Sequence, residues 1–133
     1  MGSFLDALVV SPLTDGDNWK VEEPFYYRDN KLGKITVDAG FITDFGSIPR
    51  PFWNIISPYG KAGRGFVIHD QLYTFQVVNG NKIKQKAADD CLMRMMTELK
   101  VSPFVRWMIY GHLRMWGWIA WLNHKKDLIK RNS

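Results

Sequence analysis

A histidine and an aspartate, His69 and Asp70, interrupt an apolar run between Gly65 and Tyr73. If this run forms a helix, His69 and Tyr73 lie one turn apart on the same face, and Asp70 lies next to that face. Titratable side chains on a half-buried helix are costly unless other polar groups pair with them. The chain must therefore fold so that a polar partner reaches this helix.

A second helical stretch supplies a candidate partner about twenty residues later, at Asp89 and Asp90. Helical periodicity places Asp89 at the edge of the apolar arc and Asp90 on the polar side. The arc itself is formed by Cys91, Leu92, Met95, Met96 and Leu99. Two antiparallel helices with a short connection would let Asp89 face His69. A carboxylate on one imidazole nitrogen fixes the tautomer and makes the other nitrogen more basic.

Asp70 would then be left to bind a metal ion, because carboxylate and carbonyl oxygens suit a hard cation such as calcium. The segment from Asp44 to Pro49 contains two breakers, Gly46 and Pro49, and is interpreted as a loop. Gly46 permits close backbone approach or a positive φ, which cation-binding loops use. The alternative is a tight turn without a ligand.

The remainder of the chain predicts an α+β domain, because strands are followed by helices. Residues 1–60 are interpreted mainly as strands and loops, with expected strands at 5–12, 19–28, 32–37 and 41–43, a hairpin turn at 29–31 and a short helix at 51–56. Residues 61–124 are interpreted as three helices, at about 62–78, 83–100 and 103–123, followed by a charged tail at 125–133. We expect a single domain over residues 1–133, with the first two helices as an antiparallel pair that carries the site.

Composition narrows the class of protein further. The chain has 133 residues, a net charge of +5 and one cysteine, Cys91, which excludes a disulfide framework and a zinc site built on several thiolates. No signal peptide and no apolar stretch of transmembrane length stands out, so we expect a protein made in a reducing compartment. The positive charge suits an anionic partner, such as lipid headgroups or nucleic acid.

The third helix is rich in tryptophan and basic residues, with Trp107, Trp116, Trp118 and Trp121 beside Arg106, Arg114, Lys125 and Lys126. Such a helix could lie at a lipid interface, but an aromatic stripe at helical spacing more commonly belongs to the core. We therefore expect these side chains to be buried. His112 and His124 have no evident partners in the sequence.

Four segments together resemble a family of unknown function found mainly in bacteriophages and prophages. They are Phe41 to Arg50, His69 to Tyr73, Ala88-Asp89, and Tyr110 to Gly117. The resemblance implies a protein made in a bacterial host cytoplasm and associated with the virion, but it implies no activity.

A second resemblance does imply an activity. His69-Asp70-x-x-Tyr73 followed by Ala88-Asp89-x-x-Leu92 is similar to the core of phospholipases A2, and closest to the disulfide-free type of parvovirus capsid proteins. The resemblance makes His69 the general base, Asp89 the residue that orients it, and Tyr73 a hydrogen-bond donor to Asp89.

In that family the aspartate after the catalytic histidine ligates calcium, together with backbone carbonyls of a glycine loop, which would make Asp70 a calcium ligand. The usual Tyr-x-Gly-x-Gly loop is absent here, and Leu92 replaces the usual phenylalanine. Asp44-Phe45-Gly46, continuing into Ser47, is the candidate loop, and Tyr59-Gly60 is the alternative.

Three hypotheses follow. The first is a phage-encoded, phospholipase A2-like lipid ester hydrolase with a His-Asp dyad and calcium, acting as a virion or tail component at the cell envelope. The second is a non-enzymatic phage structural or tail-assembly protein, whose His69-Asp70-Asp89 cluster is a buried hydrogen-bond network or a structural metal site. The third is a basic protein that binds nucleic acid or inhibits a host factor, which no recognition motif supports.

Overall fold

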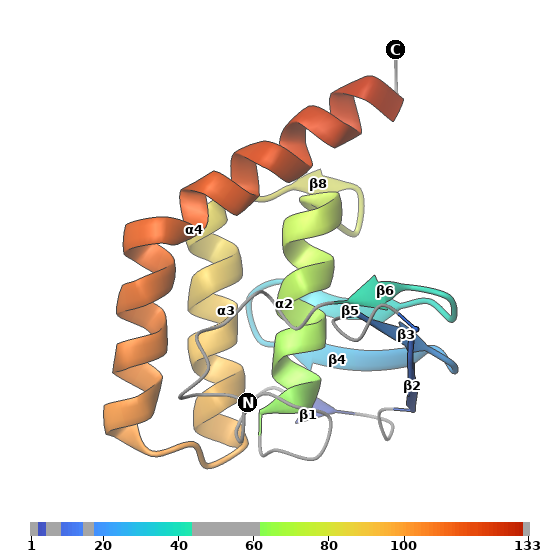
Figure 1. Ribbon diagram of the computed structural model, residues 1–133. Helices are drawn as coiled ribbons and strands as arrows, with labels where there is room; N and C mark the ends of the chain where they lie inside the picture. Colours follow the sequence, from blue (N-terminus) through green and yellow to red (C-terminus); the bar gives the residue numbers. More distant parts are fainter. Residues whose placement is uncertain (1–2, 5–8, 15–17, 44–61, 132–133) are drawn as a thin grey trace.

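The computed structural model describes residues 3–4, 9–14, 18–43 and 62–131 (Figure 1). The described elements are strands in the first part of the chain and helices in the second, with one small hairpin between two helices. This confirms the α+β fold class. The expected short helix at 51–56 and the candidate loop residues Asp44, Phe45, Gly46 and Ser47 lie outside the described residues, as does Tyr59-Gly60.

The strands before the helices form two small antiparallel sheets. One has the order β1-β4-β5, from β1 (Ser3–Phe4), β4 (Phe25–Asp29) and β5 (Gly33–Val37). The other has the order β2-β3-β6, from β2 (Val10–Pro12), β3 (Trp19–Val21) and β6 (Ile42–Thr43). The stretch interpreted as one strand over 19–28 is thus divided between β3 and β4, which belong to different sheets.

The expected hairpin joins β4 to β5, with Tyr27 opposite Ile35 and Phe25 opposite Val37. Alternate residues of both strands are buried, as expected for a sheet with one face in the core. The side chain of Asp29 shapes the turn, because its Oδ2 accepts hydrogen bonds from two following backbone N–H groups.

The first described helix, α2 (Gly63–Phe75), ends three residues before the expected boundary at Val78. Gln76 adopts a left-handed conformation, with φ of 57°, and its backbone N–H donates to the carbonyl of Leu72. Val77–Val78 (β7) and Asn81–Lys82 (β8) then pair across Asn79-Gly80, whose φ angles are both positive. Asn-Gly is the preferred sequence of this two-residue turn, so the stretch interpreted as a helix end is a hairpin.

The other two helices are α3 (Gln85–Glu98) and α4 (Pro103–Arg131). Helix α4 extends beyond the expected end at Asn123, so the segment interpreted as a charged tail is helical through Arg131. Leucine, isoleucine, lysine and arginine are all compatible with helix there, and no glycine or proline interrupts the segment. Among the described helices, none combines the length and the hydropathy that a membrane-spanning segment needs.

The three helices lie side by side, with α2 next to the strands and with α2 and α3 running antiparallel (Figure 1). Helix α4 bends near its middle, and its second half crosses the ends of the other two helices (Figure 1). The core lies between the β4–β5 hairpin, α2 and α3, and includes Phe25, Tyr27, Val37, Phe66, Ile68, Leu72, Leu92, Met95 and Met96. Polar side chains that point between α2 and α3 therefore lie next to apolar core residues.

Candidate functional site

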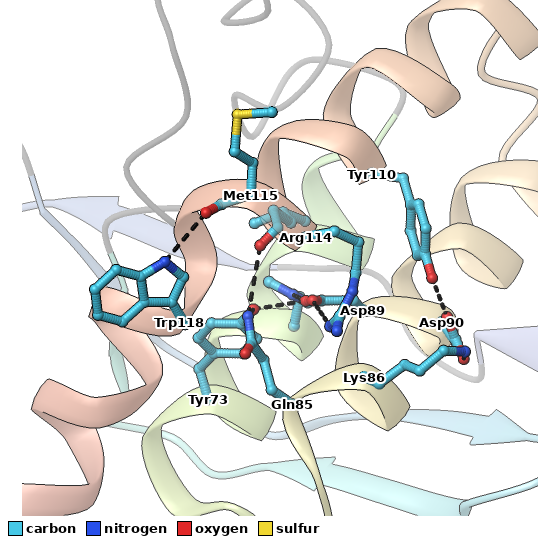
Figure 2. A network of polar contacts seen from close by, with 11 residues as sticks. Tyr73, Gln85, Lys86, Asp89, Asp90, Tyr110, Arg114, Met115 and Trp118 are labelled. Carbon is cyan, nitrogen blue, oxygen red and sulfur yellow. Dashed lines mark hydrogen bonds and ion pairs between the residues drawn. The ribbon is translucent and has the colours of Figure 1, made fainter.

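Asp89 is the centre of a buried polar cluster between the three helices (Figure 2). Its side chain is fully buried, and its Oδ1 accepts a hydrogen bond from His69 Nε2 at 2.9 Å. His69 itself is 2% exposed. Because the carboxylate takes the Nε2–H, the neutral imidazole keeps its lone pair on Nδ1.

Tyr73 lies one turn after His69 on α2 and donates its hydroxyl to the same Asp89 oxygen, at 2.6 Å. Burial, and then the neighbouring Asp89 carboxylate, raise the pKa of Tyr73 above its ordinary value, so the phenol stays protonated and acts as a donor. Gln85 Nε2 in turn donates to the Tyr73 oxygen at 3.2 Å. The expected shared face of His69 and Tyr73 is therefore present, and both side chains point at Asp89.

Helix α4 supplies a third donor that the sequence reasoning did not identify. Arg114 Nη1 lies 2.9 Å from Asp89 Oδ2 and places a positive charge beside the buried carboxylate (Figure 2). Tyr110 and Gly117 precede and follow Arg114 at helical spacing on the same face. That spacing, inside the Tyr110-to-Gly117 segment, is the signal that would have found Arg114.

Asp90 has a separate role on the outer side of α3. Its carboxylate accepts hydrogen bonds from Tyr110 at 2.6 Å and from Lys86 at 2.7 Å (Figure 2). Although burial alone would raise it, these two hydrogen bonds hold the pKa of Asp90 below its ordinary value. The expected difference between an inward Asp89 and a more solvated Asp90 is therefore present.

A pocket of about 260 Å³ adjoins His69 between α2 and α4. From α2 it is lined by His69, Asp70 and Tyr73, and from α4 by His112, Leu113, Trp116, Gly117, Ile119, Ala120, Asn123 and His124. All three histidines of the chain line this pocket. His112 and His124, for which the sequence suggested no partner, thus belong to the surroundings of the candidate site.

The sequence led us to expect an Asp70 carboxylate left free for a metal ion, but in the structure this carboxylate has a hydrogen-bond donor. Asp70 is 8% exposed, and its Oδ2 accepts a hydrogen bond from Thr43 Oγ1 at 2.7 Å. Oxygen ligands of this kind suit calcium, but the described part of the chain contains no group of three His, Cys, Asp or Glu side chains that could hold a metal ion. The residues described here therefore supply one carboxylate and fall short of a complete calcium site.

Most tryptophans of α4 are not in the core, contrary to the expectation. Trp107, Trp116 and Trp118 are 62%, 54% and 50% exposed. Only Trp121 packs inward, with its ring edge-on to Tyr73 at 5.1 Å between centroids. The inward face of α4 is completed instead by aliphatic residues such as Ile109 and Leu113.

The structure brings together His69, Tyr73 and Asp89, places Asp70 beside them at the pocket, and adds Arg114, Gln85 and Thr43. A family model described as "Protein of unknown function (DUF1353)" matches residues 19–112. No curated protein and no solved structure matches the chain. The matched segment includes the dyad, whereas Arg114 and Gly117 lie just after it.

Proposed function

The chain belongs to the family described as a protein of unknown function (DUF1353), and we propose that it hydrolyses an ester bond of a phospholipid. The observation that carries the proposal is the buried contact between His69 Nε2 and Asp89 Oδ1, 2.9 Å long, beside a pocket. A histidine oriented in this way by a carboxylate is a suitable general base near neutral pH.

In the proposed reaction, His69 Nδ1 takes a proton from a water molecule as its oxygen attacks the ester carbonyl carbon. The same nitrogen then returns the proton to the alkoxide that leaves. Asp89 holds the imidazole in the required tautomer, and Tyr73 and Arg114 hold the Asp89 carboxylate in place. The four side chains thus form one positioned unit rather than a histidine on a mobile surface.

Two features support a lipid as the substrate. The α4 wall of the pocket is largely apolar, with Leu113, Trp116 and Ile119 among its residues, which suits an acyl chain. The net charge of +5 favours an anionic surface. The setting, a virion or tail component at the cell envelope, comes only from the resemblance to phage proteins.

Calcium remains part of the proposal, on the chemistry of Asp70 alone. A calcium ion bound there would supply the charge that polarises the ester carbonyl and stabilises the oxyanion. Binding of calcium to the wild type and to Asp70→Asn, followed by isothermal titration calorimetry, tests this part without any activity measurement. Equal heats for the two proteins would remove calcium at Asp70 from the proposal.

The activity is tested by fatty-acid release from mixed phospholipid vesicles, for the wild type and His69→Gln, with calcium and with chelator. We expect release by the wild type and a loss of about a hundred-fold or more in the variant, because the general base is gone. Tyr110→Phe is the matched control, since it changes a hydrogen bond to Asp90 and leaves the dyad untouched. Absence of release by well-folded wild type would refute the proposal.

A second candidate function is that of a non-enzymatic phage structural protein. It is favoured by one observation: the Asp89 carboxylate is fully buried and receives donors from His69, Tyr73 and Arg114, as a structural network requires. Under this hypothesis His69→Gln lowers stability, and neither protein releases fatty acid.

A further inference from the structure

Helix α4 carries an apolar stripe on the face opposite to the core. The outer stripe consists of Phe104, Trp107, Met108, Met115, Trp118, Ile119, Leu122 and Ile129, which are 45–73% exposed. Their spacing of three, four and seven residues places them on one side of the helix. Since Ile109 and Leu113 fill the opposite, buried side, α4 is apolar on two faces and only one of them is covered in the monomer.

An exposed apolar face of this kind indicates a contact with another surface. We propose that the outer stripe docks on an anionic lipid surface and lies along it. This proposal rests on the proposed function, because it assigns a role in hydrolysis to the pocket beside the stripe. Docking itself is measured without hydrolysis.

Charge favours lipid over a second protein helix as the occupant. Between Pro103 and Arg131 the sequence has six Lys and Arg residues and one acidic residue, Asp127. Lys125, Lys126 and Lys130 are exposed near the C-terminal end of the stripe. A helix with apolar and aromatic residues on one face and lysines beside them is typical of binding at the boundary between headgroups and acyl chains.

A second copy of the chain is the competing occupant, because positions 104, 108, 111, 115, 118, 122, 125 and 129 alternate by four and three residues, as in a coiled coil. However, Lys125 interrupts that seam, and Gly111 leaves a gap in it. Paired copies would also bring lysines together with few acidic residues to balance them. An anionic membrane provides the opposite charge that a second copy lacks.

The stripe is continuous with the candidate site. Ile119 belongs to the outer stripe and also lines the pocket, and Trp116, 54% exposed, lines the pocket next to it. A membrane against the stripe would therefore reach the pocket from the α4 side, where His69 lies at the other wall. Docking on this face would thus bring lipid to the pocket that His69 lines.

The test measures sedimentation of the protein with vesicles of phosphatidylglycerol and of phosphatidylcholine. We expect binding to phosphatidylglycerol that weakens with added salt, and an affinity lower by about ten-fold or more in Met115→Gln/Leu122→Gln. Val77→Gln on β7 is the matched control, because Val77 is 42% exposed and Leu122 is 45% exposed. The control should bind as the wild type does.

Three results would overturn the proposal: no vesicle binding by folded wild type, binding that the double variant does not weaken, or a dimer in light scattering that the double variant dissociates. His69→Gln separates docking from catalysis, since it should bind vesicles like the wild type. Binding without fatty-acid release would leave the docking surface standing and refute the hydrolase. Release without stripe-dependent binding would do the reverse.

Discussion

At the scale of single residues, the cluster is defined by how a buried charge is satisfied. The Asp89 side chain has no exposed surface, yet each of its oxygens has a donor. Donors from α2 reach Oδ1, and Arg114 of α4 reaches Oδ2. Such a carboxylate is tolerated only with several hydrogen bonds and an opposite charge nearby. Tyr73 and Arg114 stabilise the buried Asp89 carboxylate, and the carboxylate that they hold in place fixes the orientation of His69.

Tyr73→Phe tests the contribution of one donor. The change removes the hydrogen bond to Asp89 Oδ1 and takes an acceptor from Gln85, so we expect a loss of about 2 kcal/mol in the free energy of unfolding. Urea denaturation measures it.

Tyr110→Phe again provides the matched comparison. It removes a hydroxyl that also lies 2.6 Å from an aspartate, but Asp90 is 33% exposed at its side chain. Water replaces the lost donor there, so the loss should stay below about 1 kcal/mol. Equal losses in the two variants would contradict a special role for burial at Asp89.

At the scale of elements, the close approach of α4 to α2 assembles the site. Gly117 is buried in α4 and lies against the Tyr73 hydroxyl. A Cβ at this position would lie 2.7 Å from the Tyr73 oxygen and 2.9 Å from Gln85 Nε2. Glycine is therefore required for contact, whereas a helix would otherwise favour alanine.

Gly117→Ala should destabilise the fold by about 1–3 kcal/mol, because the tyrosine ring and α4 must separate. Gly111→Ala, in the same helix, should stabilise it by about 0.5–1 kcal/mol, since Gly111 is exposed and its Cβ would meet nothing within 4 Å. Thermal unfolding of the pair measures the difference. A stabilising effect of Gly117→Ala would show that α4 does not need this close contact.

At the scale of the whole molecule, one ion pair joins the sheet to the helices. Arg94 on α3 makes two hydrogen bonds to Asp29 at the end of β4, at 3.0 and 2.8 Å. Asp29 is 1% exposed at its side chain and Arg94 is 28% exposed. Burial alone would raise the pKa of Asp29. The hydrogen bonds from Arg94 and from two backbone N–H groups nevertheless hold this pKa below its ordinary value of 3.8.

This pair predicts an acid-dependent loss of stability. Because the folded pKa of Asp29 is lower than the unfolded one, its contribution is present above pH 3.8 and is lost as the pH falls through the folded pKa. Asp29→Asn should lower the free energy of unfolding by about 2 kcal/mol at pH 7 and show a smaller deficit in acid. Urea denaturation at a series of pH values measures both, and a deficit that grows towards low pH would contradict the assignment.

Local pattern was sufficient for the β4–β5 hairpin and for the existence of α2, α3 and α4, because alternation and helical periodicity are short-range signals. It did not predict β7 and β8, nor the division of residues 19–28 between β3 and β4. Boundaries were less predictable. Asn79-Gly80 was interpreted as the end of a helix, although the turn chemistry of Asn-Gly favours a hairpin. The aromatic residues of α4 were expected in the core, but most of them are exposed. Helical spacing shows which residues share a face, but it does not show which face another element covers.

The sequence by itself determined that His69, Tyr73 and Asp89 share inward helix faces, since helical geometry repeats within each segment. Only the tertiary structure decided that Arg114 reaches Asp89, that Thr43 donates a hydrogen bond to Asp70, and that the outer stripe of α4 faces solvent. Those contacts join residues about 25 or more positions apart, or depend on which side of α4 the other helices cover. Contacts between residues so far apart in the sequence depend on how helices and strands pack, and no local periodicity encodes that packing.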